Sequence, residues 1–175
     1  MTKPMCAPRY DFRTLLTYRV LVLSNTLGVG AVRLYARQFG IPLAEWRLLA
    51  ALAICAPASV NRLAAALNTD KGWISRTAAA LVAKGLAQTR TDSGDARRTQ
   101  IVLSAAGRAI YKRILPAAIE RQDRLVSVMS AAEQVIFDEL LERLQRQAQI
   151  LAGPTVPEKR SAAKAAGKKT ETATK

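Results

Sequence analysis

Residues 59–107 decide the fold, and they read SVNRLAAALNTDKGWISRTAAALVAKGLAQTRTDSGDARRTQIVLSAAG. Their pattern of polar and apolar residues predicts a short helix, a tight turn and a second helix over residues 70–84. Two short strands, 86–91 and 99–103, follow around the polar loop 92–98. Two helices followed by a β-hairpin are typical of a winged helix-turn-helix, a module whose second helix enters the major groove of DNA.

Further helices are expected before this stretch. Apolar residues recur at steps of three and four over residues 12–39, which predicts one long helix with a broad apolar face. Pro42 suits the first turn of a further helix, which should run to about Cys55.

Two more helices should follow the hairpin. Ser104 can cap the first of them, over residues 105–127. Ser130 and Glu133 form a capping box that opens the second, and Gly153 followed by proline ends it. The expected fold is therefore mainly α with a small β-wing, in which long terminal helices flank the winged helix-turn-helix.

The charge of the chain points to a polyanionic partner. Lysine and arginine number 27 against 13 acidic residues, which gives a net charge of +14. Residues 1–153 alone hold 21 basic and 11 acidic side chains, which leaves +10 on the part expected to fold. Nucleic acid or an anionic membrane face would balance this charge. Residues 154–175 lack aromatic side chains and are expected to form a disordered basic tail, either solubilising or gripping phosphates.

Composition argues against an enzyme, a metal site and a cofactor. Histidine is absent, and Cys6 and Cys55 are too few to form a zinc site or a disulfide framework. Cys55 should be a small buried apolar residue, whereas Cys6 belongs to a flexible N-terminus over residues 1–10. No glycine-rich phosphate loop and no paired carboxylates on one helix face occur. No secretory signal and no membrane span are visible, so we expect a cytoplasmic, nucleoid-associated protein.

The second helix, over residues 70–84, should present a DNA-binding face. On a helical wheel the residues expected to pack inward are Ile74, Ala78, Leu81, Val82 and Gly85. The opposite face carries small residues around Arg76, whose guanidinium can bond guanine O6 and N7 together. Trp73 can either stack on DNA or pack against the wing. The predicted DNA contacts of the whole module are Ser59, Lys71, Trp73, Ser75, Arg76, Thr77, Arg90, Arg97 and Arg98.

The loop between the two strands forms the second predicted contact. Arg97 and Arg98 lie at its tip, from which an arginine can enter a narrow, A·T-rich minor groove. Asp95 has the wrong sign for DNA, and we expect it to stabilise the wing by holding Arg97 in a bidentate pair. The alternative is an ordinary solvated turn.

At these positions the chain resembles the MarR family of transcriptional regulators, from Tyr18 to Leu151. The segments that carry the resemblance are Ile74-Ser75-Arg76, Leu81-Val82-x-x-Gly85-Leu86, Asp95-x-Arg97 and Ile101-x-Leu103-Ser104-x-x-Gly107. The resemblance implies a MarR-like domain over residues 11–153. Within it, residues 42–104 would form the DNA-binding part, and 11–40 with 105–153 the dimerisation body.

The resemblance also carries functional expectations. It implies a homodimer that binds a palindromic operator in double-stranded DNA, and often relief of repression by a small, frequently aromatic anion. A crevice for such an effector could be lined by Arg19, Arg37 and Trp46. The alternative reading of the same charge is a nucleoid-type protein that binds DNA with little sequence preference.

Overall fold

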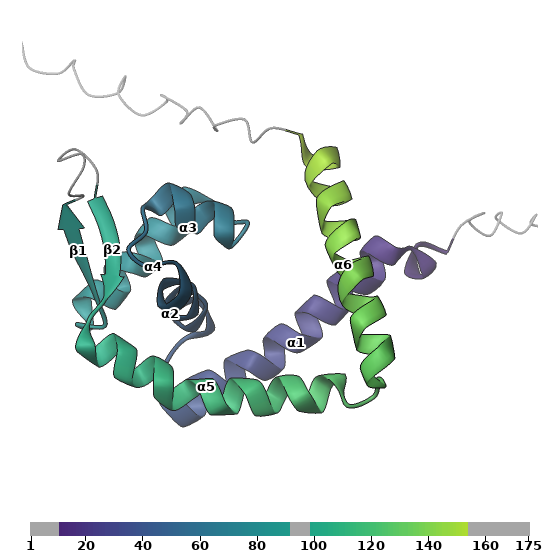
Figure 1. The fold of residues 1–175 in the computed structure, drawn as a ribbon, viewed down its shortest axis with the longest axis horizontal. Helices are drawn as coiled ribbons and strands as arrows, with labels where there is room; N and C mark the ends of the chain where they lie inside the picture. Colours follow the sequence, from purple (N-terminus) through teal and green to yellow (C-terminus); the bar gives the residue numbers. More distant parts are fainter. Residues whose placement is uncertain (1–10, 92–98, 154–175) are drawn as a thin grey trace, which may run out of the picture. The chain divides into compact units, whose positions relative to one another are not determined.

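The computed structural model describes residues 11–91 and 99–153, and Figure 1 shows their fold. The chain divides into two compact units, the first ending at Asp123 and the second beginning at Arg124. The elements of the first unit, with the helix that continues into the second, are η1 (Phe12–Thr14), α1 (Leu16–Phe39), α2 (Leu43–Cys55), α3 (Val60–Ala66), α4 (Lys71–Ala83), β1 (Ala87–Thr91), β2 (Thr99–Leu103) and α5 (Ala105–Val126). The second unit contains α6 (Ala131–Ala152).

The prediction of one helix over residues 12–39 was wrong at its start. Asp11 accepts a hydrogen bond from the backbone N–H of Arg13 and caps a single 3-10 turn, η1. Leu15 then adopts an extended conformation, with φ of −66° and ψ of 133°, so that α1 begins only at Leu16. The apolar periodicity continues through the break, but the local cap of Asp11 redirects the backbone. Gly40 ends α1 in the left-handed conformation, with φ of 66°.

The core of the first unit lies where α2, α3 and α4 pack together beside the β-hairpin (Figure 1). The largest fully buried side chains are Leu48, Leu49, Leu52, Leu63, Ile74, Leu81 and Ile114. Burying each such side chain contributes roughly 1.5–3 kcal/mol. Five of these seven residues lie on α2 and α4, so these two helices are held rigidly against one another. Cys55, expected to be buried, is half-buried at the end of α2 and carries a free thiol.

An ion pair joins the first turn of α2 to the C-terminal end of α4. Nζ of Lys84 donates to both carboxylate oxygens of Glu45, at 2.7 and 2.8 Å. The Glu45 side chain is only 9% exposed, whereas that of Lys84 is 46% exposed. A buried carboxylate needs such a partner, because an uncompensated charge inside a protein costs several kcal/mol. The pair therefore fixes the C-terminal end of α4 relative to α2.

The predicted hairpin is confirmed, with β1 beginning at Ala87 instead of residue 86. The strands are antiparallel, and Ala87 pairs with Leu103 at one end while Thr91 pairs with Thr99 at the other. Ile101 and Leu103 are buried, as their alternation predicts. Ala58, just before α3, adds a β-bridge to Ile101.

The base of the hairpin is connected closely to the start of α5. Ser104 accepts a hydrogen bond from the backbone N–H of Gly107 at 2.9 Å, which confirms its predicted role as a cap. Its hydroxyl also donates to the carbonyl of Gly85 at 2.6 Å, and its backbone N–H donates to the carbonyl of Leu86. One serine thus joins the end of β2, the turn after α4 and the first turn of α5.

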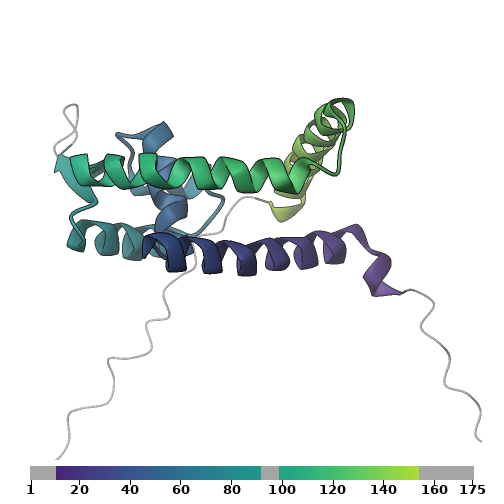
Figure 2. The same ribbon diagram turned by 90° about the horizontal axis from the view of Figure 1, so that it is seen from below.

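Side chains of α5 also hold α1. The guanidinium of Arg121 donates to the backbone carbonyl of Leu27 at 2.5 Å, and that of Arg113 lies 5.8 Å from the ring centroid of Phe39. Arg121, late in α5, contacts Leu27 in the middle of α1, whereas Arg113, earlier in α5, contacts Phe39 at the end of α1. The two helices therefore run antiparallel, as Figure 2 shows. Gly30 lies beside this contact, where a Cβ would be 3.4 Å from Nη2 of Arg121.

In the second unit, the predicted capping box is present at the start of α6. Ser130 accepts from the backbone N–H of Glu133, and Glu133 accepts from the backbone N–H of Ser130. That backbone hydrogen bond, followed by one from the Ser130 hydroxyl, lowers the pKa of Glu133 from its usual value. Among the described residues no single helix is long and apolar enough to cross a membrane, and α1 and α2, which pass that test only together, meet at 83°.

Candidate DNA-binding interface

Helix α4 is fixed in place by its cap and by one fully packed face. Asp70 accepts a hydrogen bond from the backbone N–H of Trp73 at 2.7 Å, which satisfies one of the free amides at the helix start. The inward face consists of Ile74, Thr77, Ala78 and Leu81. This spacing of three and four residues describes one side of a helix, so the opposite side must face solvent.

The exposed face of α4 carries the cations that the sequence predicts. Lys71, Ser75 and Arg76 are all exposed, and they lie within the first two turns of the helix. The guanidinium of Arg76 lies over the first turn, where a Cβ added to Gly72 would be 3.1 Å from Nη1 of Arg76. Gly72 therefore leaves the space that this guanidinium occupies.

Two predictions on α4 were wrong. Thr77 is only 8% exposed and belongs to the packed face, so its hydroxyl does not face a DNA groove in this structure. Val82, which the helical wheel placed inside, is 38% exposed. The packed face is centred near Thr77 and Ala78, which turns Val82 toward its edge. A small polar residue such as threonine gives no sign in the sequence of which side it faces.

The other predicted contacts within the described residues differ in their surroundings. Trp73 is half-buried and packs against the core cluster, which favours the packing alternative over full exposure to DNA. The hydroxyl of Ser59 caps α3 by accepting from the backbone N–H of Arg62 at 3.3 Å. Arg90 is exposed on β1, opposite Gln100.

Three predicted residues of the wing lie outside the described residues. They are Asp95, Arg97 and Arg98, all within the segment 92–98. Their roles in the minor groove and in stabilising the wing remain predictions from the sequence.

The residues predicted for an effector crevice do not converge within one chain. Trp46 is only 7% exposed, and its ring stacks on Tyr111 with centroids 5.7 Å apart and lies 5.3 Å from Tyr35. Arg19 and Arg37 are exposed but 18 residues apart on α1, which separates them by about 27 Å along the helix. Trp46 is therefore part of the core, and one small molecule cannot contact both arginines of the same protomer.

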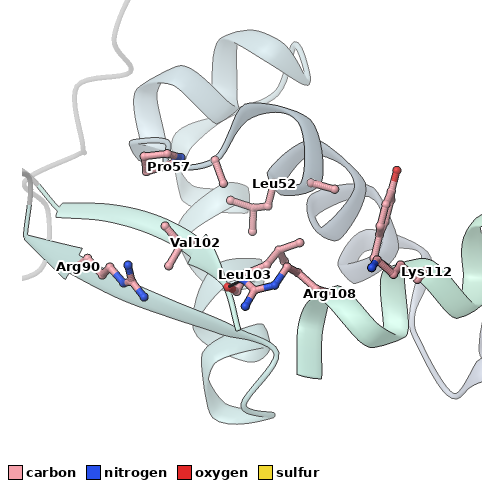
Figure 3. Close-up of a pocket in the computed structure, with 10 residues that line it drawn as sticks. Leu52, Pro57, Arg90, Val102, Leu103, Arg108 and Lys112 are labelled. Atoms are coloured by element: carbon pink, nitrogen blue, oxygen red, sulfur yellow. Dashed lines mark hydrogen bonds between the residues drawn. The ribbon is translucent and has the colours of Figure 1, made fainter. Parts of the chain in front are cut away.

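The structure instead contains a pocket that the sequence did not predict. It has a volume of about 440 Å³ and lies behind the hairpin, between the end of α2 and the first turns of α5 (Figure 3). Its lining includes Arg90, Arg108, Tyr111 and Lys112. Linear spacing could not reveal it, because its walls come from segments far apart in the sequence.

The net positive charge of residues 59–91 favours binding of a polyanion. Residues 59–91 contain Arg62, Lys71, Arg76, Lys84 and Arg90 against a single acid, Asp70. Asp70 is occupied as the cap of α4, and Lys84 is neutralised by Glu45. The side chains of Arg62, Lys71, Arg76 and Arg90 are exposed on α3, α4 and β1, where phosphates can reach them.

Comparisons with known proteins agree with this geometry. A model of the MarR family matches residues 39–98, which extend from the end of α1 through the hairpin loop. The chain is 31% identical over 110 residues to the uncharacterized HTH-type transcriptional regulator YxaD of Bacillus subtilis, a match that covers 63% of this chain and 77% of YxaD.

Solved structures share the fold. A MarR/EmrR family transcriptional regulator from Acinetobacter sp. ADP1 is similar with a TM-score of 0.75 and 28% identity, over 79% of this chain and 98% of that one. The S. aureus MepR–DNA complex gives a TM-score of 0.72 at 21% identity, over 79% of this chain and all of MepR. Structures with this fold thus include one bound to DNA and one, PcaV of Streptomyces coelicolor, in complex with its natural ligand. The chain belongs to the MarR family, whose members are DNA-binding transcriptional regulators with a winged helix-turn-helix and not enzymes.

Proposed function

We propose that the protein is a sequence-specific transcriptional repressor that binds a palindromic operator as a homodimer. The observation that carries this proposal is the exposed face of α4, where Arg76 and Lys71 project from a helix whose other face is fully packed. A rigid helix with one long donor among small residues can lie deep in a major groove and read base edges. Bound at a promoter, such a dimer would exclude the transcription machinery.

The proposed dimer is supported by apolar side chains that one chain leaves uncovered. Those on α1 that are at least 44% exposed are Leu16, Val20, Leu21, Val22, Leu23, Val29 and Val32. Those on α6 that are at least 38% exposed are Val135, Ile136, Phe137, Leu140, Leu141, Leu144, Ile150 and Leu151. Soluble monomers rarely expose apolar side chains in such numbers on one element. A second copy of the chain would cover them and set two α4 helices about 34 Å apart, in successive major grooves.

The competing function is that of a nucleoid-type protein, which the net charge of +14 favours. Competition separates the two functions. Genomic fragments retained by the protein are sequenced, and the most enriched fragment is bound in the presence of excess random duplex. A regulator should keep its site with a preference of about 10³-fold or more over random DNA. Loss of binding in proportion to the added competitor would establish the nucleoid-type function instead.

Arg76 should supply much of this discrimination. We expect Arg76→Ala to reduce the preference for the operator over random duplex by about 1–3 kcal/mol, because one bidentate contact to guanine is lost. Fluorescence anisotropy on both DNAs measures the difference. Arg47→Ala, which removes an exposed cation from α2, is the matched control and should leave the preference unchanged. An equal loss of affinity for the operator and for random duplex would show that Arg76 contacts a phosphate and not a base.

A further inference from the structure

The first turn of α2 is fixed to two other helices. The ring centroid of Trp46 lies 5.3 Å from that of Tyr35 on α1 and 5.7 Å from that of Tyr111 on α5. Trp46 is only 7% exposed, so this stack is part of the core. Glu45 is the neighbouring residue, and consecutive side chains on a helix point in different directions. The stack therefore holds the turn in place, while the carboxylate of Glu45 is directed at the end of α4.

The end of α4 is held at two points. Nζ of Lys84 donates to both carboxylate oxygens of Glu45, at 2.7 and 2.8 Å. One residue later, the carbonyl of Gly85 accepts from the hydroxyl of Ser104 at 2.6 Å. This second contact holds one backbone atom just beyond the helix, and α4 could still turn about that point. The ion pair connects the end of the helix to α2 through two charge-assisted hydrogen bonds, so it can set the direction of α4.

The apolar contacts of α4 set its direction less closely than the ion pair does. Hydrophobic burial is non-directional, and the crossing angles of packed helices vary by about 15–20°. Arg76 lies nine residues before Gly85, which is about 13 Å along the helix. A tilt of about 15° about Gly85 would therefore move Arg76 by roughly 3 Å. One base-pair step is about 3.4 Å, so such a tilt changes the base pair that Arg76 can reach.

We infer that Glu45 is a positioning residue for operator recognition, which acts through Lys84 by setting the direction of α4 and hence the half-site spacing that the dimer accepts. Two-fold symmetry would repeat any tilt in the second protomer and so double its effect on this spacing. Glu45 is buried, and Lys84 lies at the opposite end of α4 from Lys71, so neither needs to touch DNA. The inference rests on the proposed palindromic operator, but the direction of α4 can be measured without DNA.

A double variant separates direction from stability and charge. Lys84→Met alone would leave the carboxylate of Glu45 buried without a partner, which destabilises the whole fold. Glu45→Met combined with Lys84→Met avoids this, since apolar side chains often replace a buried ion pair without loss of stability. The double variant also keeps the net charge, and its urea midpoint should be close to that of the wild type. Lys84→Arg keeps the pair, and Arg47→Met, which removes an exposed cation from the same part of α2, is the control.

Fluorescence anisotropy with three DNAs tests the spacing. The DNAs are the enriched operator and two copies of it, with one base pair inserted or removed between the half-sites. The wild type, Lys84→Arg and Arg47→Met should each bind the altered copies about tenfold or more weakly than the operator. The double variant should bind all three DNAs within about threefold of one another. Its affinity for random duplex should equal that of the wild type, because the net charge is the same.

Residual dipolar couplings of the backbone amides measure the direction of α4 in the DNA-free protein. In the wild type and in Lys84→Arg, the couplings of α2 and α4 should fit one alignment with the helices as they lie in the structure. In the double variant, those of α4 should be reduced or should require another orientation.

The inference is overturned if the double variant keeps the wild-type couplings in α4 or the wild-type preference among the three spacings. It is also overturned if Lys84→Arg loses either of them, since the pair would then not be the cause. A wild-type protein that binds all three DNAs equally would refute the palindromic operator of the proposed function. The couplings alone would then decide whether Glu45 sets the direction of α4.

Discussion

The Gly107→Ala variant is expected to lose about 3–5 kcal/mol of its free energy of unfolding. A Cβ on Gly107 would lie only 1.9 Å from the backbone oxygen of Leu86 and 2.9 Å from its carbonyl carbon. The obstacle is backbone, so it cannot move aside as a flexible side chain would. That carbonyl also accepts from the backbone N–H of Ser104, at 3.1 Å. Separating the two segments would therefore break the junction of hairpin and α5, in a protein whose total stability is about 5–15 kcal/mol.

Urea unfolding followed by circular dichroism measures this loss, and a second glycine provides the control. Gly28 lies within α1, and a Cβ there would meet nothing within 4 Å. Gly28→Ala should raise stability by roughly 0.5–1 kcal/mol, because alanine loses less backbone freedom in a helix than glycine. The same chemical change should thus have opposite signs at the two positions. A Gly107→Ala protein that unfolds at the wild-type urea midpoint would show that α5 does not pack on Leu86 as described.

The second large effect is expected for Arg97→Ala. If Arg97 enters the minor groove, each protomer loses a charge-assisted contact worth about 1.5–3 kcal/mol. A homodimer loses two such contacts, so its operator affinity should fall by about 10²-fold or more. The β1–β2 ladder, closed by the pair Thr91 and Thr99, does not include this side chain. The fold and the oligomeric state should therefore be unchanged.

Gel-shift titration measures the affinity of this variant, and light scattering checks its oligomeric state. Arg146→Ala is the control, because it removes an exposed cation of α6 and lowers the net charge equally. Arg97→Lys separates charge from geometry, since lysine keeps the charge but cannot form a bidentate contact. An Arg97→Ala protein that binds the operator with wild-type affinity would show that Arg97 makes no stabilising contact with DNA.

The order of elements could be predicted because local chemistry marks their ends. Ser59 and Ser104 cap helices where the sequence predicts it, and the capping box of Ser130 and Glu133 is complete. The start of α1 could not be predicted in the same way. The apolar pattern favours a helix from residue 12, whereas Asp11 can cap a separate turn, and only the structure shows that the cap prevails.

The orientation of individual side chains was less predictable than the elements. Arg76 is exposed as expected because it lies opposite a clearly apolar stripe. Thr77 belongs to the packed face of α4 together with Ile74, Ala78 and Leu81. Its polar side chain suggested instead that it faces DNA. Trp46 was misplaced because its partners, Tyr35 and Tyr111, come from α1 and α5, and no local pattern announces such a stack.

Neither the pocket nor the proposed dimer can be predicted from local sequence patterns, because both depend on segments that only folding or assembly brings together. Arg90, Arg108 and Lys112 are ordinary surface cations in the sequence, and they become a site only when the hairpin folds onto α5. The division into dimerisation helices, 11–40 and 105–153, and a DNA-binding part, 42–104, stays a prediction, because it depends on a second copy of the chain.

Methylation interference on the enriched operator tests the central claim most directly, since it reports which guanines α4 approaches in the major groove. Methylating guanine N7 should block binding in two clusters related by two-fold symmetry, with centres one helical turn, about 10–10.5 base pairs, apart. The Arg76→Ala protein should lose sensitivity at one guanine in each cluster. A single cluster, or binding that no guanine methylation affects, would contradict a dimer that reads DNA through the exposed face of α4.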